Sequence, residues 1–406
     1  MKKLLGSLLA TILMVGVTAV PLPAGASVDT AALVPTPAPG LSSFLKSVSC
    51  LTSISCIAVG YTSDGTSALS LIESWDGAAW TVVLSPSVAN SESLLRGVSC
   101  VDSSFCFAVG NSGPWNGEHT LTEMWDGTSW TIVPSPDGTN HSRLSSVSCV
   151  SVSFCVAVGS DASQTATLME FWDGSTWSVR SITSPEATYN SLNSVACVSE
   201  AFCMAVGSAS SGTWKAIATE WNGVSWNPVA IPNSGPGSFG QSISCRTADF
   251  CVFTGLANGT PQTGIAGFWD GSAWTLDPSF VVDPGDGLGM DAIDCASEQA
   301  CVVSGSRFLA SGLQEPVLVN WDGSGWSEIA APAESVTDYS ELYAVSCATQ
   351  WSCMSVGYYE PVGLDATLAI NVTGTEPPPT STTTIASSTT SSTIPSSEPL
   401  PPAFTG

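Results

Sequence analysis

The chain repeats one unit seven times, and this repeat constrains its fold more than any other feature. In the first unit, "SVSCLTSISCIAVG" spans residues 47–60 and carries two cysteines in a C-x5-C arrangement. The pair recurs with a period of 48 to 52 residues, and a glycine always follows the second cysteine by four positions. In six units a W-[DN]-G-x-x-W element comes next, first at residues 75–80 and last at residues 321–326. A period of this length indicates a repeat architecture such as a propeller.

Each unit contains four strand-like runs, which we name strands A to D. In the first unit they are "LKSVSC", "CIAVG", "LSLIESW" and "WTVVLSP", which are rich in Val, Ile, Thr and Trp and show no helical periodicity. The Asp-Gly between C and D favours a tight hairpin, because Gly accepts positive φ. The seven units therefore predict an all-β, seven-bladed β-propeller with four antiparallel strands per blade.

The two ends of the repeat region predict how the ring closes. The seventh unit has no W-D-G-x-x-W element and no strand D, because a proline-rich segment follows residues 372–374. At the other end, "AALVPTP" (31–37) matches "WTIVPSP" (130–136), the strand D of the second unit. We therefore expect an N-terminal strand to complete the last blade, which removes an exposed sheet edge.

The segments that flank the repeats predict export. Lys2 and Lys3 precede an apolar run from Leu4 to Val20, and Ala24-Gly25-Ala26 fits a small-x-small cleavage site. We expect a signal peptide over 1–26, since the run is short for the alternative, an N-terminal membrane anchor. The propeller is expected over 27–374. The Ser/Thr/Pro-rich tail, 375–406, should be disordered, and its end "LPPAFTG" loosely resembles a sortase signal, so the protein is either released or attached to the cell wall.

The cysteines predict disulfides. Export permits them, whereas a zinc site would need shorter spacings and partner ligands, for which only His119 and His141 are present. A seven-residue loop gives about 2–2.5 kcal/mol per bridge, and each bridge also fixes the register of the A–B hairpin. We expect seven bridges, each inside one blade: Cys50–Cys56, Cys100–Cys106, Cys149–Cys155, Cys197–Cys203, Cys245–Cys251, Cys295–Cys301 and Cys347–Cys353.

Charge and composition exclude several classes of function. The chain has 9 Lys and Arg against 34 Asp and Glu, a net charge of −25, which disfavours nucleic acid and anionic membranes. Two histidines are too few for a copper oxidase, and neither lies in a nucleophile motif. Only one of five arginines falls where the arginines of a sialidase would converge. We therefore expect a monomer with no metal, no cofactor, no membrane insertion and no assigned catalytic residue.

The candidate binding residues come from one variable position of strand A. The loops between paired cysteines and between paired tryptophans keep a constant length, whereas the B–C and D–A connections vary, so one face of the disc is free to vary. Four residues before each first cysteine, the side chain varies and is polar. If strand A is innermost, these residues ring the channel: Lys46, Arg96, Ser145, Asn193, Gln241, Asp291 and Tyr343. The alternative is a solvated lining without a ligand.

Aromatic residues add further candidates. Trp115, Trp214 and Tyr358 lie in or beside B–C loops, where exposed rings can stack on sugars, although packing between blades is the alternative. The paired tryptophans of the W-[DN]-G-x-x-W elements are instead expected to pack the blades. The Asp or Asn of each element is expected to form the turn, because an acid repeated in every blade serves the repeat.

The order of these features resembles kelch-type β-propellers over about 29–374: an apolar strand ending in glycine, a variable loop, an aromatic followed by Asp, and a Trp before a proline-containing exit. It also resembles secreted bacterial proteins with SVSC…CxAVG…WDGxxW repeats. Propellers serve as oxidases, glycosidases, lectins and scaffolds, so the resemblance implies a fold and no single activity.

Three functions stay open. The first is a secreted or surface-associated binding module for a glycan or an extracellular protein. The second is a polysaccharide hydrolase or lyase in which Asp291 acts with a loop acid, Asp64, Asp161 or Glu360. The third is a structural spacer without a specific ligand.

Overall fold

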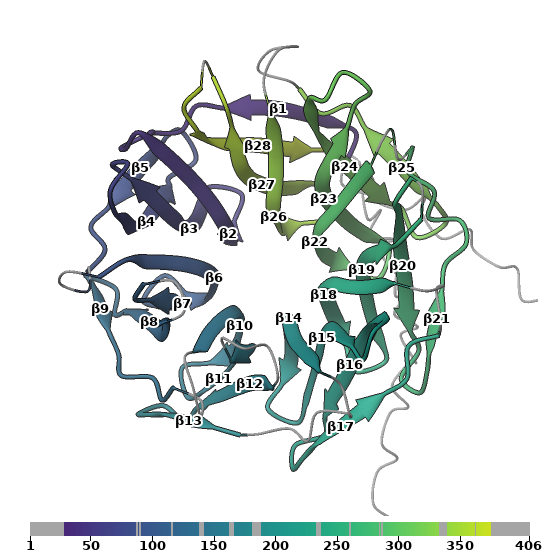
Figure 1. The fold of residues 1–406 in the computed structure, drawn as a ribbon, viewed down its shortest axis with the longest axis horizontal. Coiled ribbons are helices and arrows are strands. Elements are labelled where there is room, and N and C mark those ends of the chain that lie inside the picture. Colours follow the sequence, from purple (N-terminus) through teal and green to yellow (C-terminus); the bar gives the residue numbers. More distant parts are fainter. Residues whose placement is uncertain are drawn as a thin grey trace, which may run out of the picture. The chain divides into compact units, whose positions relative to one another are not determined.

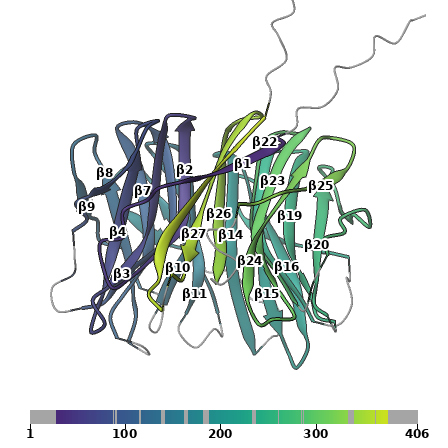
Figure 2. The same ribbon diagram turned by 90° about the horizontal axis from the view of Figure 1, so that it is seen from above.

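A computed structural model shows seven four-stranded antiparallel sheets arranged around a central axis, as the repeat predicts (Figure 1; Figure 2 gives the side view). The structure describes residues 28–374 except 87, 89–90, 115–116, 138–141, 162–165, 181–187, 233–236, 260, 284, 286, 333–338 and 362. The predicted signal peptide, the predicted tail, Trp115 and His141 lie outside the described residues. The described residues include no helix that is long and apolar enough to cross a membrane.

The strands of the first four blades follow the predicted order A to D. Blade 1 contains β2 (Ser42–Thr52), β3 (Ser55–Ser63), β4 (Ala68–Trp75) and β5 (Trp80–Val83). Blade 2 contains β6 (Ser93–Asp102), β7 (Phe105–Ser112), β8 (His119–Trp125) and β9 (Trp130–Ile132). Blade 3 contains β10 (Ser142–Ser151), β11 (Phe154–Asp161), β12 (Thr167–Trp172) and β13 (Trp177–Val179). Blade 4 contains β14 (Tyr189–Ser199), β15 (Phe202–Ser210), β16 (Trp214–Trp221) and β17 (Trp226–Val229).

The last blades confirm how the ring closes. Blade 5 contains β18 (Ser238–Thr247), β19 (Phe250–Ala257), β20 (Thr263–Trp269) and β21 (Trp274–Leu276). Blade 6 contains β22 (Gly287–Ser297), β23 (Ala300–Phe308), β24 (Gln314–Trp321) and β25 (Trp326–Ile329). Blade 7 combines β26 (Ser340–Thr349), β27 (Ser352–Tyr359) and β28 (Ala366–Thr373) with β1 (Thr30–Val34) from the other end of the chain. In this blade β1 pairs antiparallel with β28, so an N-terminal strand completes the last sheet.

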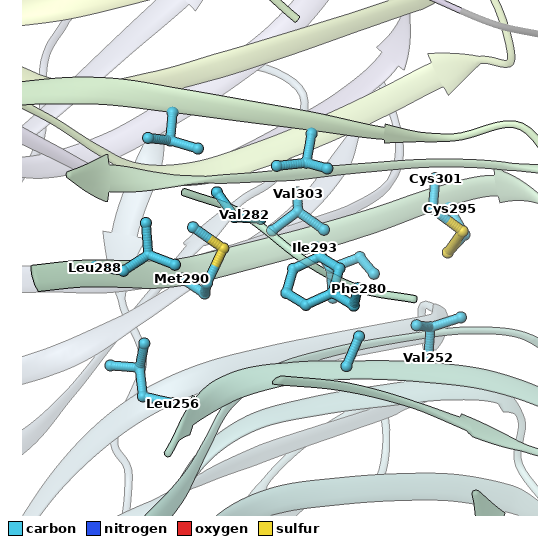
Figure 3. Packing of buried hydrophobic residues seen from close by; sticks show 13 residues of the cluster. Val252, Leu256, Phe280, Val282, Leu288, Met290, Ile293, Cys295, Cys301 and Val303 are labelled. Atoms are coloured by element: carbon cyan, nitrogen blue, oxygen red, sulfur yellow. A yellow bond between two sulfur atoms is a disulfide. The ribbon is translucent and has the colours of Figure 1, made fainter. Parts of the chain in front are cut away.

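The hydrophobic core is divided among the blade interfaces. Strand A of each blade contacts strand A of the next, and β26 contacts β2 to complete the ring. Seven clusters of buried side chains each combine residues of two adjacent blades. Figure 3 shows the cluster between blades 5 and 6, where Phe280 of the connecting segment lies beside Val252, Met290 and Ile293. A sheet buried on both faces explains why strand B is a continuous apolar run rather than an alternating one.

Three glutamates are buried within this apolar packing. Glu73, Glu123 and Glu170 hold equivalent places on strand C of blades 1 to 3, and each has 0% of its surface exposed. The Ser85 hydroxyl donates to Glu123 at 2.8 Å, and the Ser135 hydroxyl donates to Glu170 at 2.6 Å, in both cases from the preceding blade. Burial raises the pKa of Glu73 and Glu170 to about 8 and that of Glu123 to about 7. Glu73 and Glu170 are therefore largely protonated at neutral pH, and all three carboxyls are protonated in mildly acidic solution.

The tryptophan pairs and the Asp-Gly turns have the structural roles predicted for them. Trp75 and Trp80 pack with ring centroids 5.7 Å apart, and the Trp75 indole N–H donates to the carbonyl of Ser53 in the A–B turn at 3.2 Å. The Asp76 carboxylate accepts the backbone N–H groups of residues 78 and 79. The same indole-to-carbonyl bond recurs in blades 2 to 6. It joins the C–D hairpin to the A–B turn, so the two constant-length loops form one fixed edge of blades 1 to 6.

All seven predicted disulfides are present, each inside one blade, and the described residues contain no free cysteine. The paired cysteines are direct cross-strand neighbours of strands A and B, as Cys50 and Cys56 are in blade 1. Each bridge therefore closes the A–B hairpin at its turn and holds its register.

The serines of the "SVSC" phrase link most blades to the next. The Ser49 hydroxyl accepts the backbone N–H of Cys100 at 3.1 Å, and the Ser47 hydroxyl accepts that of Val98 at 3.1 Å. The bond to a cysteine N–H recurs at four other interfaces, Ser99–Cys149, Ser148–Cys197, Ser244–Cys295 and Ser346–Cys50. Strand A is an inner edge strand, so these N–H groups have no partner in their own sheet. Each bond satisfies one of them and contributes about 0.5–1.5 kcal/mol.

A β-bulge in every strand A explains the constant glycine. In blade 1, Leu45 pairs with Gly60 and Ser47 pairs with Val59, so Lys46 is an extra residue without a partner. The other six blades have the same irregularity at the same place. A methyl group added to Gly60 would overlap the Phe44 carbonyl oxygen, and the six equivalent glycines meet an equivalent carbonyl. The glycine is therefore required by the close approach of the two backbones at the bulge.

We expect Gly60→Ala to destabilise the propeller by about 1–3 kcal/mol, because the methyl would meet backbone atoms that cannot move without disturbing the bulge. The shift of the urea unfolding midpoint measures this effect. Gly325→Ala is the matched control, since an added methyl there meets no atom within 4 Å. Equal midpoints for the two variants would contradict the role assigned to the bulge.

Candidate functional site

The seven polar residues singled out from the sequence line one central cavity. It has a volume of about 240 Å³ and is bounded by strand A of every blade. Each of the seven is the extra residue of its bulge, which turns its side chain away from the sheet. In ring order they are Lys46, Arg96, Ser145, Asn193, Gln241, Asp291 and Tyr343. The same β-bulge in every blade therefore presents seven different side chains to one cavity.

Lys46 belongs to an aromatic cluster at the junction of blades 7 and 1. Its Nζ lies 3.1 Å from the ring centroid of Tyr343 and 5.5 Å from that of Phe44. Burial, together with the charge of Arg96, lowers the pKa of Lys46 to about 8, although the charges of Glu341 and Asp291 oppose this shift. The ammonium is therefore still mostly protonated at pH 7, held by π-faces in place of a carboxylate.

Arg96 is the second cation of the cavity. Its Nε donates to the Asn111 side chain at 2.8 Å, which fixes the guanidinium plane. Burial lowers the pKa of Arg96, the charge of Arg143 acts in the same direction, and the charge of Glu118 opposes both. An arginine stays protonated despite this shift, so Lys46 and Arg96 place two positive charges in the cavity from adjacent blades.

The part of the cavity formed by blades 3 to 5 is lined by neutral side chains that form hydrogen bonds. The Asn193 amide donates to the carbonyl of Gly240 at 2.8 Å and to the Gln241 side chain at 3.2 Å. Its oxygen accepts the Ser191 hydroxyl at 3.0 Å. Ser145 also lines this side. Amide and hydroxyl groups both donate and accept, so this wall can complement polar groups of either kind.

Asp291 and Asp294 are the acids that line the cavity within the described residues. Burial, together with the charge of Glu341, raises the pKa of Asp291 to about 8 against the opposing charge of Lys46. The Asp291 Oδ2 atom is buried without a hydrogen-bond partner. Asp294 replaces the linking serine and accepts the Cys347 backbone N–H at 2.7 Å. The charge of Lys46 lowers the pKa of Asp291 and the charge of Asp291 raises the pKa of Lys46, so the two groups interact electrostatically. Blade 7 alone separates them.

The loop acids considered for hydrolysis lie elsewhere. Asp64, Asp161 and Glu360 are not among the residues that line the cavity. Asp64 is exposed and accepts the backbone N–H groups of Thr66 and Ser67, which makes it a turn-forming residue. The structure therefore brings none of the three together with Asp291.

Two of the candidate aromatics, Trp214 and Tyr358, are not among the described residues that line the cavity. Trp214 packs between Tyr189 and Phe239, with ring centroids 5.8 Å and 5.2 Å away. Tyr358 stacks on Tyr343 at 5.7 Å and contacts Phe44 at 4.9 Å. These contacts are those expected of packing between blades. Trp115 lies outside the described residues, and a sugar-stacking role for any of the three stays a prediction.

Sequence reasoning missed the β-bulge that creates the site. It noted the constant glycine but assigned it no cause, although a glycine inside a strand pattern is a known sign of a bulge. It also overlooked the linking serines and the three buried glutamates. The glutamates left a usable signal, since an ionisable residue inside an apolar strand C is unusual.

Comparisons with known proteins show the fold and no family. No protein-family model and no curated protein matches the chain. Among solved structures, YCF48 bound to D1 peptide is similar with a TM-score of 0.54 and 14% identity, covering 86% of this chain and 100% of that one. YCF48 from Cyanidioschyzon merolae gives 0.53 and 15% identity, covering 85% and 98%. The GH74 xyloglucanase from Xanthomonas campestris gives 0.53 and 13% identity, covering 84% of this chain and 55% of that one.

Proposed function

We propose that this protein is a secreted or surface-associated binding module that holds its ligand at the central cavity and the adjoining variable loops. The observation that carries the proposal is the bulge in every strand A. It keeps the scaffold constant while seven different side chains point into one space. A scaffold with fixed strands and a varied lining is what a recognition site requires.

The cysteines and the predicted signal peptide support an extracellular location. Seven disulfides persist in an oxidising compartment and would be reduced in a typical cytosol. Retention at the cell wall through the tail is part of the same proposal. The strand order also supports a kelch-like origin of the repeat.

A protein or peptide ligand is favoured over a neutral glycan. A neutral sugar is usually held by a free aromatic face, but Tyr358 and Trp214 pack against other rings. The cavity instead offers two cations and a row of amide and hydroxyl groups. A propeller of similar fold, YCF48, has been solved with a bound peptide, which supports peptide binding as a use of this architecture.

The alternative of a polysaccharide hydrolase or lyase receives less support. The similar xyloglucanase shows that the fold can carry such an activity. Two carboxyls on either side of a sugar bond are needed, however, and Asp294 is bonded to the Cys347 backbone while the loop acids lie elsewhere. The spacer alternative gives no reason to bury uncompensated polar groups in the channel.

The test is a binding screen of the folded, oxidised protein on peptide and glycan arrays. The variant Arg96→Ala/Asn193→Ala/Gln241→Ala removes three cavity side chains, and Lys215→Ala, which removes an exposed side chain of β16, is the control. We expect a ligand that the control retains and the triple variant loses, with both variants folded by circular dichroism. A ligand retained by both would place the site elsewhere, and the absence of any ligand would favour a spacer.

A further inference from the structure

The two cations of the central cavity have no counter-ion within bonding distance. Among the described residues neither Lys46 nor Arg96 forms an ion pair, whereas Arg307 on blade 6 contacts three carboxylates at 2.7 to 3.9 Å. The charges of Glu341 and Glu118 reach the two cations only from farther away. Two like charges on neighbouring blades, both largely removed from water, are costly unless an anion joins them.

Arg96 is positioned to receive a carboxylate. Its Nε is occupied by Asn111 at 2.8 Å, which leaves the two terminal nitrogens without an acceptor among the described residues. The fixed plane presents these nitrogens as a fork, the geometry that matches the two oxygens of a carboxylate. Lys46, held over Tyr343, supplies a second positive charge to the same cavity.

We propose that the central cavity binds the C-terminal carboxylate of a peptide, with Arg96 and Lys46 as its anion site. The proposal rests on the binding function proposed above and names the ligand class for that site. The state of Asp291, which lines the same cavity, agrees with it. Asp291 is mostly protonated at pH 7, because burial raises its pKa to about 8, and so it repels a bound carboxylate little.

A peptide end fits this cavity better than an acidic polysaccharide. A volume of about 240 Å³ accepts the end of a chain, and the Asn193 and Gln241 amides can pair with peptide N–H and carbonyl groups. Lys46 and Tyr358 already occupy surface of the Tyr343 ring on which a sugar would stack. A polyuronate also carries a charge on every residue and would be repelled by a protein of net charge −25, whereas a peptide brings one terminal carboxylate.

The experiment compares each peptide as a free acid and as its C-terminal amide. N-terminally labelled decapeptides are titrated with the full oxidised chain by fluorescence anisotropy, alongside oligouronates and neutral oligosaccharides. The proteins are the wild type, Arg96→Gln, Lys46→Gln and the control Lys215→Gln, which removes an exposed cation on β16. We expect free acids to bind at least about tenfold more tightly than amides, the loss of one charge-assisted bond. Arg96→Gln should abolish this difference, so that the variant binds the free acid no more tightly than the amide.

The outcomes distinguish a failure of the carboxylate site from a failure of the binding function proposed above. Equal binding of acid and amide by the wild type, which needs no folded variant, would overturn the carboxylate site and leave a binding module intact. An acid–amide difference that survives in both Arg96→Gln and Lys46→Gln would do the same. Oligouronate binding without any peptide binding would overturn the peptide assignment. No binding of any probe would overturn both proposals.

Discussion

Reduction of the seven disulfides is expected to unfold the propeller at 25 °C. Each bridge closes a loop of seven residues, since its cysteines are six positions apart, and contributes about 2.4 kcal/mol by restricting the unfolded chain. Seven such contributions sum to about 17 kcal/mol on that model, while a typical domain is stable by only about 5–15 kcal/mol. The blades cannot compensate, because every hydrophobic cluster needs two intact neighbours.

The measurement starts from the unfolded chain, because one cysteine of each pair is nearly fully buried, as Cys56 is with 2% exposed. Protein unfolded in urea with dithiothreitol is alkylated, returned to buffer and examined by far-UV circular dichroism and tryptophan fluorescence. A sample treated identically without the reductant should recover both native signals. Recovery of them by the alkylated chain would show that packing alone suffices.

The features of the fold that the sequence predicts correctly are those written as spacing along the chain. The number of C-x5-C pairs predicts the blade number, and the missing strand D of the seventh unit predicts that β1 pairs with β28. The hairpin register follows from Cys50 and Cys56, which must face each other to bond. In each case one residue type at one interval has a single structural explanation.

The features that escape prediction depend on contacts between blades or on backbone geometry. Which backbone meets Gly60 is visible only when strands A and B are paired, and the acceptor role of Ser49 requires a strand 51 residues away. The polar positions of strand A can be identified from their variation. Their contacts cannot be identified in this way, because Lys46 lies over the ring of Tyr343, which comes from the opposite end of the repeat region.

The propeller is expected to be most stable near pH 4–5 and to lose stability as the pH rises toward 8. Glu73, Glu123 and Glu170 have pKa values raised by burial from 4.5 to about 8, 7 and 8. Below pH 4.5 both folded and unfolded chains keep the proton. Between pH 4.5 and about 8 only the unfolded chain releases it, so the free energy of unfolding falls, by about 3 kcal/mol per carboxyl at pH 7.

The exposed turn acids act in the opposite direction at lower pH. Hydrogen bonds from the backbone of the turn lower the pKa of Asp76 and lower that of Asp173 to about 2. Their contribution is complete above the ordinary Asp value of 3.8 and is lost as the pH falls through the lowered values. The free energy of unfolding is therefore largest between these two pH ranges. The net charge of −25 at pH 7 also shrinks on acidification, which favours the compact state in the same direction.

Glu170→Gln separates the buried carboxyl from this general charge effect. The amide keeps the shape and cannot ionise, so the variant should gain on the order of 4 kcal/mol over the wild type at pH 8, and little at pH 4.5. Glu298→Gln removes the same charge from an exposed turn and should shift stability only slightly at either pH. Urea unfolding of the three proteins from pH 4.5 to 8.5 gives the comparison. Parallel curves for Glu170→Gln and the wild type would mean that Glu170 is already ionised in the folded protein, with Ser135 and ordered water sustaining a buried charge between blades 2 and 3.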